Sequence, residues 1–244
     1  MKLLLISNST NPGEPYLGWP KEFIKNFTDR HHVRKVLFIP YAGVNLSLDS
    51  LNASYDLYES KVAAVFQTLG LEIRSIHREK DPIDAVLSAE CIAVGGGNTF
   101  HLVACMHQTG IMKAIRSRVG KGIPFMGWSA GANVACPSLR TTNDMPIIEP
   151  ESFSCMGLVP FQINPHYLDA NPAGHGGETR QQRIEEFLAI NRDIKVVGLR
   201  EASLLEVEHE KMHLKGFRPL RLFQFGQEPK EIEQGADLSY LLQQ

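Results

Sequence analysis

The chain has 244 residues, and its hydrophobic fraction of 43% and charged fraction of 21% are typical of a soluble globular protein with an ample core. A formal net charge of −2, with lysines and arginines scattered along the chain, argues against nucleic acid or an anionic membrane as a partner. No apolar run approaches membrane-spanning length, and the apolar start of the chain stops too early for a signal peptide, so we expect a cytoplasmic protein.

Through the first 136 residues, short apolar runs alternate with amphipathic stretches. The apolar runs predict buried strands at 2–7, 34–40, 71–76, 91–94 and 123–128. Helical spacing predicts helices at 21–28, 55–69, 83–89 and 100–119, the last broken around Thr109-Gly110. Such alternation favours a single α/β domain over residues 1–244, with a doubly wound, mostly parallel sheet. Ligands bind such sheets beyond the carboxyl ends of the strands.

A glycine-rich turn at 94–100, Val-Gly-Gly-Gly-Asn-Thr-Phe, leaves one predicted strand and enters a predicted helix. Three consecutive glycines allow backbone N–H groups to approach a ligand and form a nest for an anion. The spacing is neither G-x-G-x-x-G nor that of a P-loop, which argues against a nucleotide site. We therefore expect the turn to supply a donor to an oxyanion.

The most informative segment follows the strand at 123–128, where residues 127–131 read G-x-S-x-G. An apolar strand before the serine and small residues opening a helix after it are typical of a nucleophile elbow. Gly127 and Gly131 allow backbone to pack against backbone in such a turn. Ser129 is then the candidate nucleophile, next to N–H groups that stabilise an oxyanion. The alternative is a glycine-rich turn whose serine only caps the helix.

A serine hydroxyl needs a base, and His166 has the most suitable context of the nine histidines. It follows a short apolar strand that ends in Asn164-Pro165, which favours a turn that exposes the next side chain. The segments 137–165 and 168–179 are rich in turn residues and are predicted to be loops over the site. The alternative for His166 is a solvated loop histidine.

Two carboxylates are candidates for the group that fixes the tautomer of this histidine. Asp144, in the segment 141–146, suits an Asx turn ahead of a proline equally well. Glu201 follows a predicted strand at 194–199, at the sheet edge where catalytic groups gather, or is a solvated charge there. Spacing alone does not decide between the two.

The last part of the chain predicts a helix at 179–190 and a closing antiparallel meander with strands at 204–207, 212–214 and 220–223. Residues His209 to His213 also match H-E-x-x-H, a zinc-binding pattern that needs both histidines on one helical face. The apolar residues here alternate with period two, which predicts a hairpin turning at 209–211 and disfavours zinc. The four cysteines lack metal-like spacing too and are expected to be reduced thiols.

Five segments, in order along the chain, resemble the peptidase E family of serine peptidases, the α-aspartyl dipeptidases. They are residues 95–100, 127–133, 140–146, 163–166 and 177–180. The resemblance runs from residue 3 to about residue 206. It implies a flavodoxin-like α/β fold similar to the class I glutamine amidotransferases, with serine in place of their cysteine. It also implies hydrolysis of Asp-Xaa dipeptides without metal or cofactor. We expect small peptides as partners and a monomer or homodimer.

The resemblance places Ser129 at the nucleophile position and His166 at the base position. Asp144 and Glu201 both fall on positions that suit the third member. The amidotransferases carry an acid two residues after the histidine, but Leu168 stands there in this chain. The acid must therefore come from elsewhere, and we favour Glu201 for its place at a strand end.

Substrate contacts are implied at five further positions. Arg180 matches a position suited to holding the β-carboxylate of the substrate aspartate, since the planar guanidinium can make paired hydrogen bonds. The alternative for Arg180 is a solvated residue in the first turn of a helix. The other expected contacts surround the scissile carbonyl and are Gly96, Gly97, Asn98 and Ala130.

Three other hypotheses stay open. An α/β-hydrolase esterase shares G-x-S-x-G, but it has the chain order Ser, acid, His and an H-G-G-G motif that does not occur here. Cyanophycin hydrolase, a relative that acts on a β-linked aspartyl polymer, shares the elbow. A flavodoxin-like binding module would use the elbow only as a turn.

Overall fold

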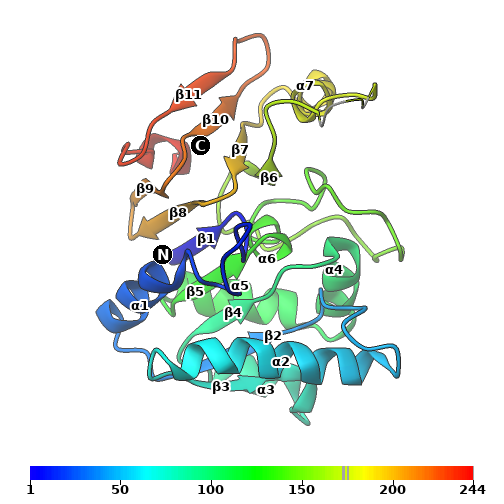
Figure 1. Cartoon of the computed structure of the whole chain (residues 1–244), viewed down its shortest axis with the longest axis vertical. Helices are drawn as coiled ribbons and strands as arrows, with labels where there is room; N and C mark the ends of the chain where they lie inside the picture. The colour runs from blue at the N-terminus through cyan, green and yellow to red at the C-terminus, as the bar shows by residue number, and fades with distance from the viewer. Residues whose placement is uncertain (172–173, 175, 244) are drawn as a thin grey trace.

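The computed structural model describes residues 1–171, 174 and 176–243. Its largest element is a seven-stranded sheet with the strand order β3-β2-β4-β5-β1-β8-β9 (Figure 1). The first five strands in that order pair in parallel, and β8 and β9 extend the sheet as an antiparallel hairpin. The bounds of the strands are β1 Lys2–Ile6, β2 Lys35–Ile39, β3 Glu72–Ser75, β4 Ile92–Val94, β5 Phe125–Trp128, β8 Ser203–Glu208 and β9 Lys211–Gly216.

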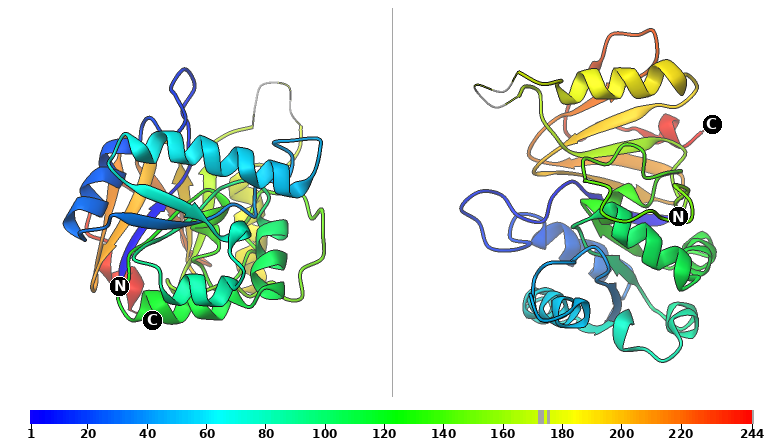
Figure 2. Two further views of the ribbon diagram at one scale, coloured as in Figure 1. Left: turned by 90° about the horizontal axis from the view of Figure 1, so that it is seen from below. Right: turned by 90° about the vertical axis from the view of Figure 1, so that its right-hand side faces the viewer.

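Helices cover both faces of this sheet (Figure 2). The side chains of β1 alternate between two buried clusters: Leu4 and Ile6 pack with α1 and α2, whereas Leu3 and Leu5 pack with the helices of the opposite face. Strands buried on both faces need continuous apolar runs, which explains why the sequence showed them so clearly. The doubly wound α/β fold is therefore confirmed. The helices are α1 Lys21–Arg30, α2 Leu51–Gln67, α3 Pro82–Leu87, α4 Thr99–Gln108, α5 Ile111–Gly120 and α6 Ala130–Asn133.

A second sheet of four strands, in the order β11-β10-β7-β6, lies beside the first (Figure 1). Strands β6 and β7 pair in parallel, and β10 and β11 add to β7 in antiparallel fashion. Helix α7 (Arg180–Ile190) packs on this sheet through Ile184 and Leu188. The strands are β6 Gln162–Tyr167, β7 Val196–Arg200, β10 Leu220–Phe223 and β11 Lys230–Ile232.

The C-terminal strands depart from the expected meander in one respect. The hairpin of β8 and β9 forms as predicted, but β10 pairs with β7 of the second sheet and not with β9. Strand β7 has no other antiparallel neighbour, so β10 satisfies hydrogen-bonding groups that would otherwise form an open edge. Pattern alone does not distinguish these pairings, because both bury the same apolar side chains.

Several local features of the chain follow from single residues or short segments. The predicted break at Thr109-Gly110 separates α4 from α5, with Gly110 at a φ of 73°. Thr179 caps α7 in a reciprocal capping box with Gln182. Between α6 and β6 the chain forms no regular element apart from an isolated bridge between Ser138 and Ser154. In the described part of the chain, every helix is too short or too polar to cross a bilayer.

Candidate active site

The G-x-S-x-G segment forms a sharp turn from β5 into α6. Ser129 has φ 55° and ψ −115°, a left-handed backbone conformation that is uncommon for any residue but glycine. A Cβ atom on Gly127 would lie 2.2 Å from the carbonyl oxygen of Gly131, and one on Gly131 would lie 2.1 Å from that of Val94. The turn therefore requires both glycines, and it holds the serine side chain out of the sheet.

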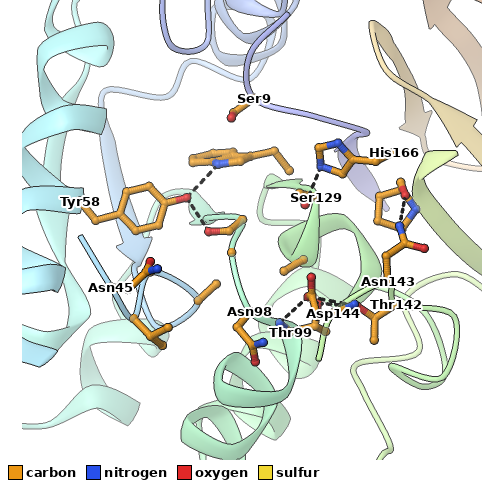
Figure 3. A pocket seen from close by; sticks show the side chains of 18 of the residues that line it. Ser9, Asn45, Tyr58, Asn98, Thr99, Ser129, Thr142, Asn143, Asp144 and His166 are labelled. Atoms are coloured by element: carbon orange, nitrogen blue, oxygen red, sulfur yellow. Dashed lines mark hydrogen bonds between the residues drawn. The ribbon is translucent and has the colours of Figure 1, made fainter. Parts of the chain in front are cut away.

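His166 approaches the serine from the second sheet. Its Nε2 lies 2.9 Å from the Oγ of Ser129 (Figure 3). The sequence predicted a turn after Pro165, but β6 continues to Tyr167 with a register shift, and His166 has a φ of 53°. A β-bulge thus re-aims the imidazole, because it leaves one residue out of the ladder. The backbone N–H of His166 donates to the hydroxyl of Ser7, at 3.0 Å.

Glu201 is hydrogen-bonded to the other ring nitrogen of this histidine. Its Oε1 lies 2.8 Å from Nδ1 of His166. A carboxylate only accepts hydrogen bonds, so Nδ1 carries the proton, and the lone pair of Nε2 faces the hydroxyl of Ser129. The His166 and Glu201 side chains are 38% and 35% exposed, so water reaches both members of the pair. The arrangement suits general-base activation of a serine.

Asp144, which the sequence left open as the histidine's partner, lies elsewhere. Its Oδ2 accepts from the backbone N–H of Thr99 at 2.7 Å, from the hydroxyl of Thr99 at 2.5 Å and from that of Thr142 at 3.1 Å. Both ring nitrogens of His166 already have partners. Asp144 is therefore anchored to the first turn of α4 and does not orient the imidazole.

Ser129 lies in a cleft of about 720 Å³ at the carboxyl ends of the parallel strands (Figure 3). Both glycine-rich turns contribute to it, as expected for open α/β sheets, in which ligands bind beyond the carboxyl ends of the strands. The predicted loop at 137–165 lines it through Thr142, Asn143, Asp144 and Ile147. In the predicted loop at 168–179, positions 172, 173 and 175 lie outside the described residues.

The turn after β4 lies directly against the serine. A Cβ on Gly96 would be 2.8 Å from the Cβ of Ser129. Within the described hydrogen-bond network, the N–H groups of Gly96, Gly97 and Ala130 have no carbonyl or side-chain acceptor. Donors that are free and close to a nucleophile are suited to a developing oxyanion. Asn98 lines the cleft as well, but its amide caps α4 and donates to the carbonyl of Met145.

A buried tyrosine, which no sequence pattern singled out, joins the two turns. The hydroxyl of Tyr58 donates to the carbonyl of Gly96 at 2.9 Å and accepts from Nε1 of Trp128 at 3.1 Å (Figure 3). Gly96 is in one turn, and Trp128 precedes the serine in the other. Burial raises the pKa of Tyr58 to about 12, so the hydroxyl stays protonated. Tyr58 thereby fixes the turn that contains Gly96 relative to the turn that contains Ser129.

Arg180, the first residue of α7, also lines the cleft and is half-buried. Burial lowers the pKa of its guanidinium, as does Arg183 nearby, whereas Asp144 raises this pKa. An arginine remains charged under such shifts. Arg183 pairs with Glu178, but no ion pair of Arg180 occurs with any residue that the structure describes. The cleft thus holds a partly desolvated cation that is suited to a carboxylate ligand.

The H-E-x-x-H segment lies outside this cleft. His209 is in the turn of the β8–β9 hairpin, and His213 is on β9. The predicted hairpin is thereby confirmed, and the helical face that zinc would need does not form. Among the described residues, Asp56, Glu59 and His77 come close enough together to hold a metal ion, but Arg78 pairs with both carboxylates.

Comparison with known proteins gives consistent matches. The family model described as Peptidase family S51 matches residues 3–215. A Peptidase E of Nostoc is 48% identical over 242 residues, covering 99% of this chain and 97% of the relative. One from Streptomyces coelicolor is 45% identical over 243 residues, covering 99% and 95%. One from Citrobacter koseri is 42% identical over 235 residues, covering 96% and 99%.

Two solved structures share the fold at low sequence identity. A peptidase from an acI-B1 Actinobacterium has a TM-score of 0.70 at 17% identity, covering 97% of this chain and 96% of that one. A putative Peptidase E protein from Listeria monocytogenes EGD-e has a TM-score of 0.60 at 21% identity, covering 88% and 98%. The two-sheet architecture is therefore shared with solved peptidases.

Proposed function

The chain belongs to peptidase family S51, and from this premise we propose that it is a serine dipeptidase that hydrolyses dipeptides with an N-terminal aspartate, Asp-Xaa. The observation that carries the proposal is the hydrogen-bonded series Glu201–His166–Ser129 in a cleft that also contains Arg180, which forms no ion pair with any described residue. The first feature supports acyl transfer from a peptide, and the second supports an acidic substrate side chain.

In the proposed mechanism, Nε2 of His166 removes the proton from Ser129 while Oγ attacks the aspartyl carbonyl carbon. The N–H groups of Ala130, Gly96 and Gly97 stabilise the resulting oxyanion. His166 then gives the proton to the leaving amine, the C–N bond breaks, and Xaa departs. Water, activated by His166, attacks the aspartyl ester and releases aspartate. Glu201 stabilises the imidazolium in both halves of the cycle.

A dipeptide screen tests this function. Asp-Leu, Asn-Leu, Glu-Leu and Ala-Leu would be compared by kcat/KM, together with β-Asp-Arg and a panel of p-nitrophenyl esters. We expect Asp-Leu to be the best substrate by a wide margin. Preference for simple esters would support an esterase, although the chain order Ser129, His166, Glu201 differs from that of the α/β-hydrolases. Preference for β-Asp-Arg would support the cyanophycin hydrolase alternative.

Arg180 is proposed to hold the β-carboxylate of the aspartate. Replacing it with alanine should lower kcat/KM for Asp-Leu about a hundredfold, because the substrate carboxylate would enter the cleft without a partner. Arg180→Lys should recover only part of this loss, since an ammonium lacks the planar fork. Arg183→Ala, one turn further along α7, is the matched control and should stay near wild type. Unchanged selectivity of Arg180→Ala for Asp-Leu over Ala-Leu would refute the role.

Tyr58 is proposed to position the oxyanion donors. Tyr58→Phe removes the hydroxyl that joins Gly96 to Trp128, so kcat for Asp-Leu should fall about tenfold with little change in KM. The control is Tyr240→Phe, because Tyr240 is 48% exposed and far from Tyr58 in the sequence. A rise in KM with kcat unchanged would instead indicate a role in ground-state binding.

The last two points concern the cellular compartment and the oligomeric state. We propose a cytoplasmic enzyme, monomeric or homodimeric, that acts as one unit across residues 1–244. The four cysteines are free thiols in the structure, which agrees with a reducing compartment. Ser129 comes from the first sheet and His166 from the second, so both sheets are needed for the site.

A further inference from the structure

The proposed substrate carries two charges next to the bond that is cut. An N-terminal aspartyl residue has an α-ammonium group on the carbon bonded to the scissile carbonyl and a β-carboxylate one carbon further away. Arg180 is suited to the carboxylate, which leaves the ammonium without an assigned partner. A peptidase that acts only at a free N-terminus needs such a partner, because a desolvated cation without one is costly.

Among the described residues that line the cleft, Asp144 carries the one carboxylate. It lines the same cleft as Ser129 and Arg180, and it lies below Ser129 in the view of Figure 3. Asp144 and Arg180 influence each other electrostatically, yet they form no ion pair with one another. The cleft therefore presents a negative and a positive side chain separately, which matches the two charges of an aspartyl residue.

The anchoring of Asp144 leaves one of its oxygens available. All three donors, from Thr99 and Thr142, bind Oδ2. In the described hydrogen-bond network, Oδ1 has no donor. Capping of α4 does not account for a carboxylate here, since Asn98 already caps this helix through its own side chain. The bonds to Oδ2 fix the orientation of the carboxylate, and Oδ1 is left to accept a hydrogen bond from a ligand.

The anchor also sets the distance between this acceptor and the reacting carbonyl. Thr99 follows Gly97 by two residues, so Asp144 is bonded to the same segment that offers the proposed oxyanion donors. In the substrate, the ammonium nitrogen and the carbonyl oxygen are likewise held close, on adjacent carbons. An acceptor that is fixed to this segment can therefore bind the ammonium group without straining the scissile bond.

We propose that Oδ1 of Asp144 binds the α-ammonium group of the substrate and so restricts the enzyme to peptides with a free N-terminus. This inference rests on the proposed function, and it gives Asp144 a binding role that is separate from the proton transfers at His166. Together with Arg180, it selects a substrate residue with a cation on Cα and an anion on the side chain.

The test compares Asp-Leu with succinyl-leucine, which is the same molecule without the amino group. Wild type should prefer Asp-Leu by about a hundredfold in kcat/KM, as expected for a charge pair that the bound substrate shields from water. Asp144→Asn keeps acceptors for Thr99 and Thr142 but loses the charge. It should lower kcat/KM for Asp-Leu about a hundredfold and change that for succinyl-leucine less than about threefold. Asp193→Asn, at an exposed position, is the control for the same charge change.

A second measurement separates this role from one in proton transfer. A fluorophosphonate probe reacts with an activated serine and carries no amine, so its rate of reaction with Asp144→Asn should equal that with wild type. Equal losses for Asp-Leu, succinyl-leucine and the probe would overturn the proposal, because Asp144 would then support the triad. Equal rates for the two substrates with wild type would overturn it without any variant. Failure of wild type to cleave Asp-Leu, with normal probe labelling, would refute the aspartyl function itself.

Discussion

Replacing Ser129 with alanine is expected to lower kcat for Asp-Leu by a factor of about 10⁴ or more, because in the described hydrogen-bond network Nε2 of His166 bonds no other hydroxyl. The fold should survive the change. The described hydrogen bond of this hydroxyl is the one to His166, and alanine meets the same backbone strain at φ 55° as serine does. The measurement is steady-state kinetics beside a thermal unfolding curve.

The control for this variant is Ser117→Ala, on the exposed face of α5, which should keep full activity. The Ser129→Ala protein should still bind Asp-Leu, since Arg180 and Asp144 are untouched, and binding can be followed by calorimetry. Turnover of Asp-Leu at the wild-type rate by the Ser129→Ala protein would contradict the nucleophile assignment. Loss of both folding and binding would show that the elbow, not the hydroxyl, had been damaged.

The second large effect is expected for Glu201→Gln. Glutamine has the size of glutamate but no charge, and its amide N–H can donate a hydrogen bond to Nδ1 and so stabilise the wrong tautomer of His166. We expect kcat to fall by a factor of about 10³, less than for a fully buried acid, because Glu201 is 35% exposed and water screens part of its charge.

This loss should have a different signature from that of Asp144→Asn. Glu201 acts through His166 on every substrate, so Asp-Leu, succinyl-leucine and the fluorophosphonate probe should all slow together in Glu201→Gln. Glu186→Gln, exposed on α7, is the control for the same substitution. A normal probe rate in Glu201→Gln would mean that another group orients the imidazole.

Much of the first sheet and of the elbow was predictable because the signals are local. Strands such as β1 and β5 are continuous apolar runs, and the turn at 127–131 needs its glycines within five residues of each other. The family resemblance was equally local, and the S51 match over residues 3–215 confirms it. Local structure of this kind can be predicted from the spacing of the residues.

The remainder of the site depends on contacts between distant residues. Spacing did not separate Asp144 from Glu201, and Glu201 was favoured only for its place at a strand end. In the structure the two separate because the chain passes from β7 into β8 beside His166. Tyr58 reaches Gly96 and Trp128 across 38 and 70 residues, with no motif around it. The pairing of β10 with β7 is likewise not written in the composition of β10, because β9 ends its own sheet and also offers an edge.

The hydroxyl of Ser7 links the two sheets at the site, since it accepts from the N–H of His166 and donates to the carbonyl of Leu199 at 2.7 Å. The first contact joins two residues that are 159 positions apart in the sequence, and the second joins two that are 192 positions apart. Closing loops of this length costs conformational entropy, which the packing of the two sheets against each other must offset. The nucleophile and its base come from different sheets, so they meet only when the two sheets dock. Hydrolytic competence is therefore a property of the assembled pair of sheets and of neither sheet alone.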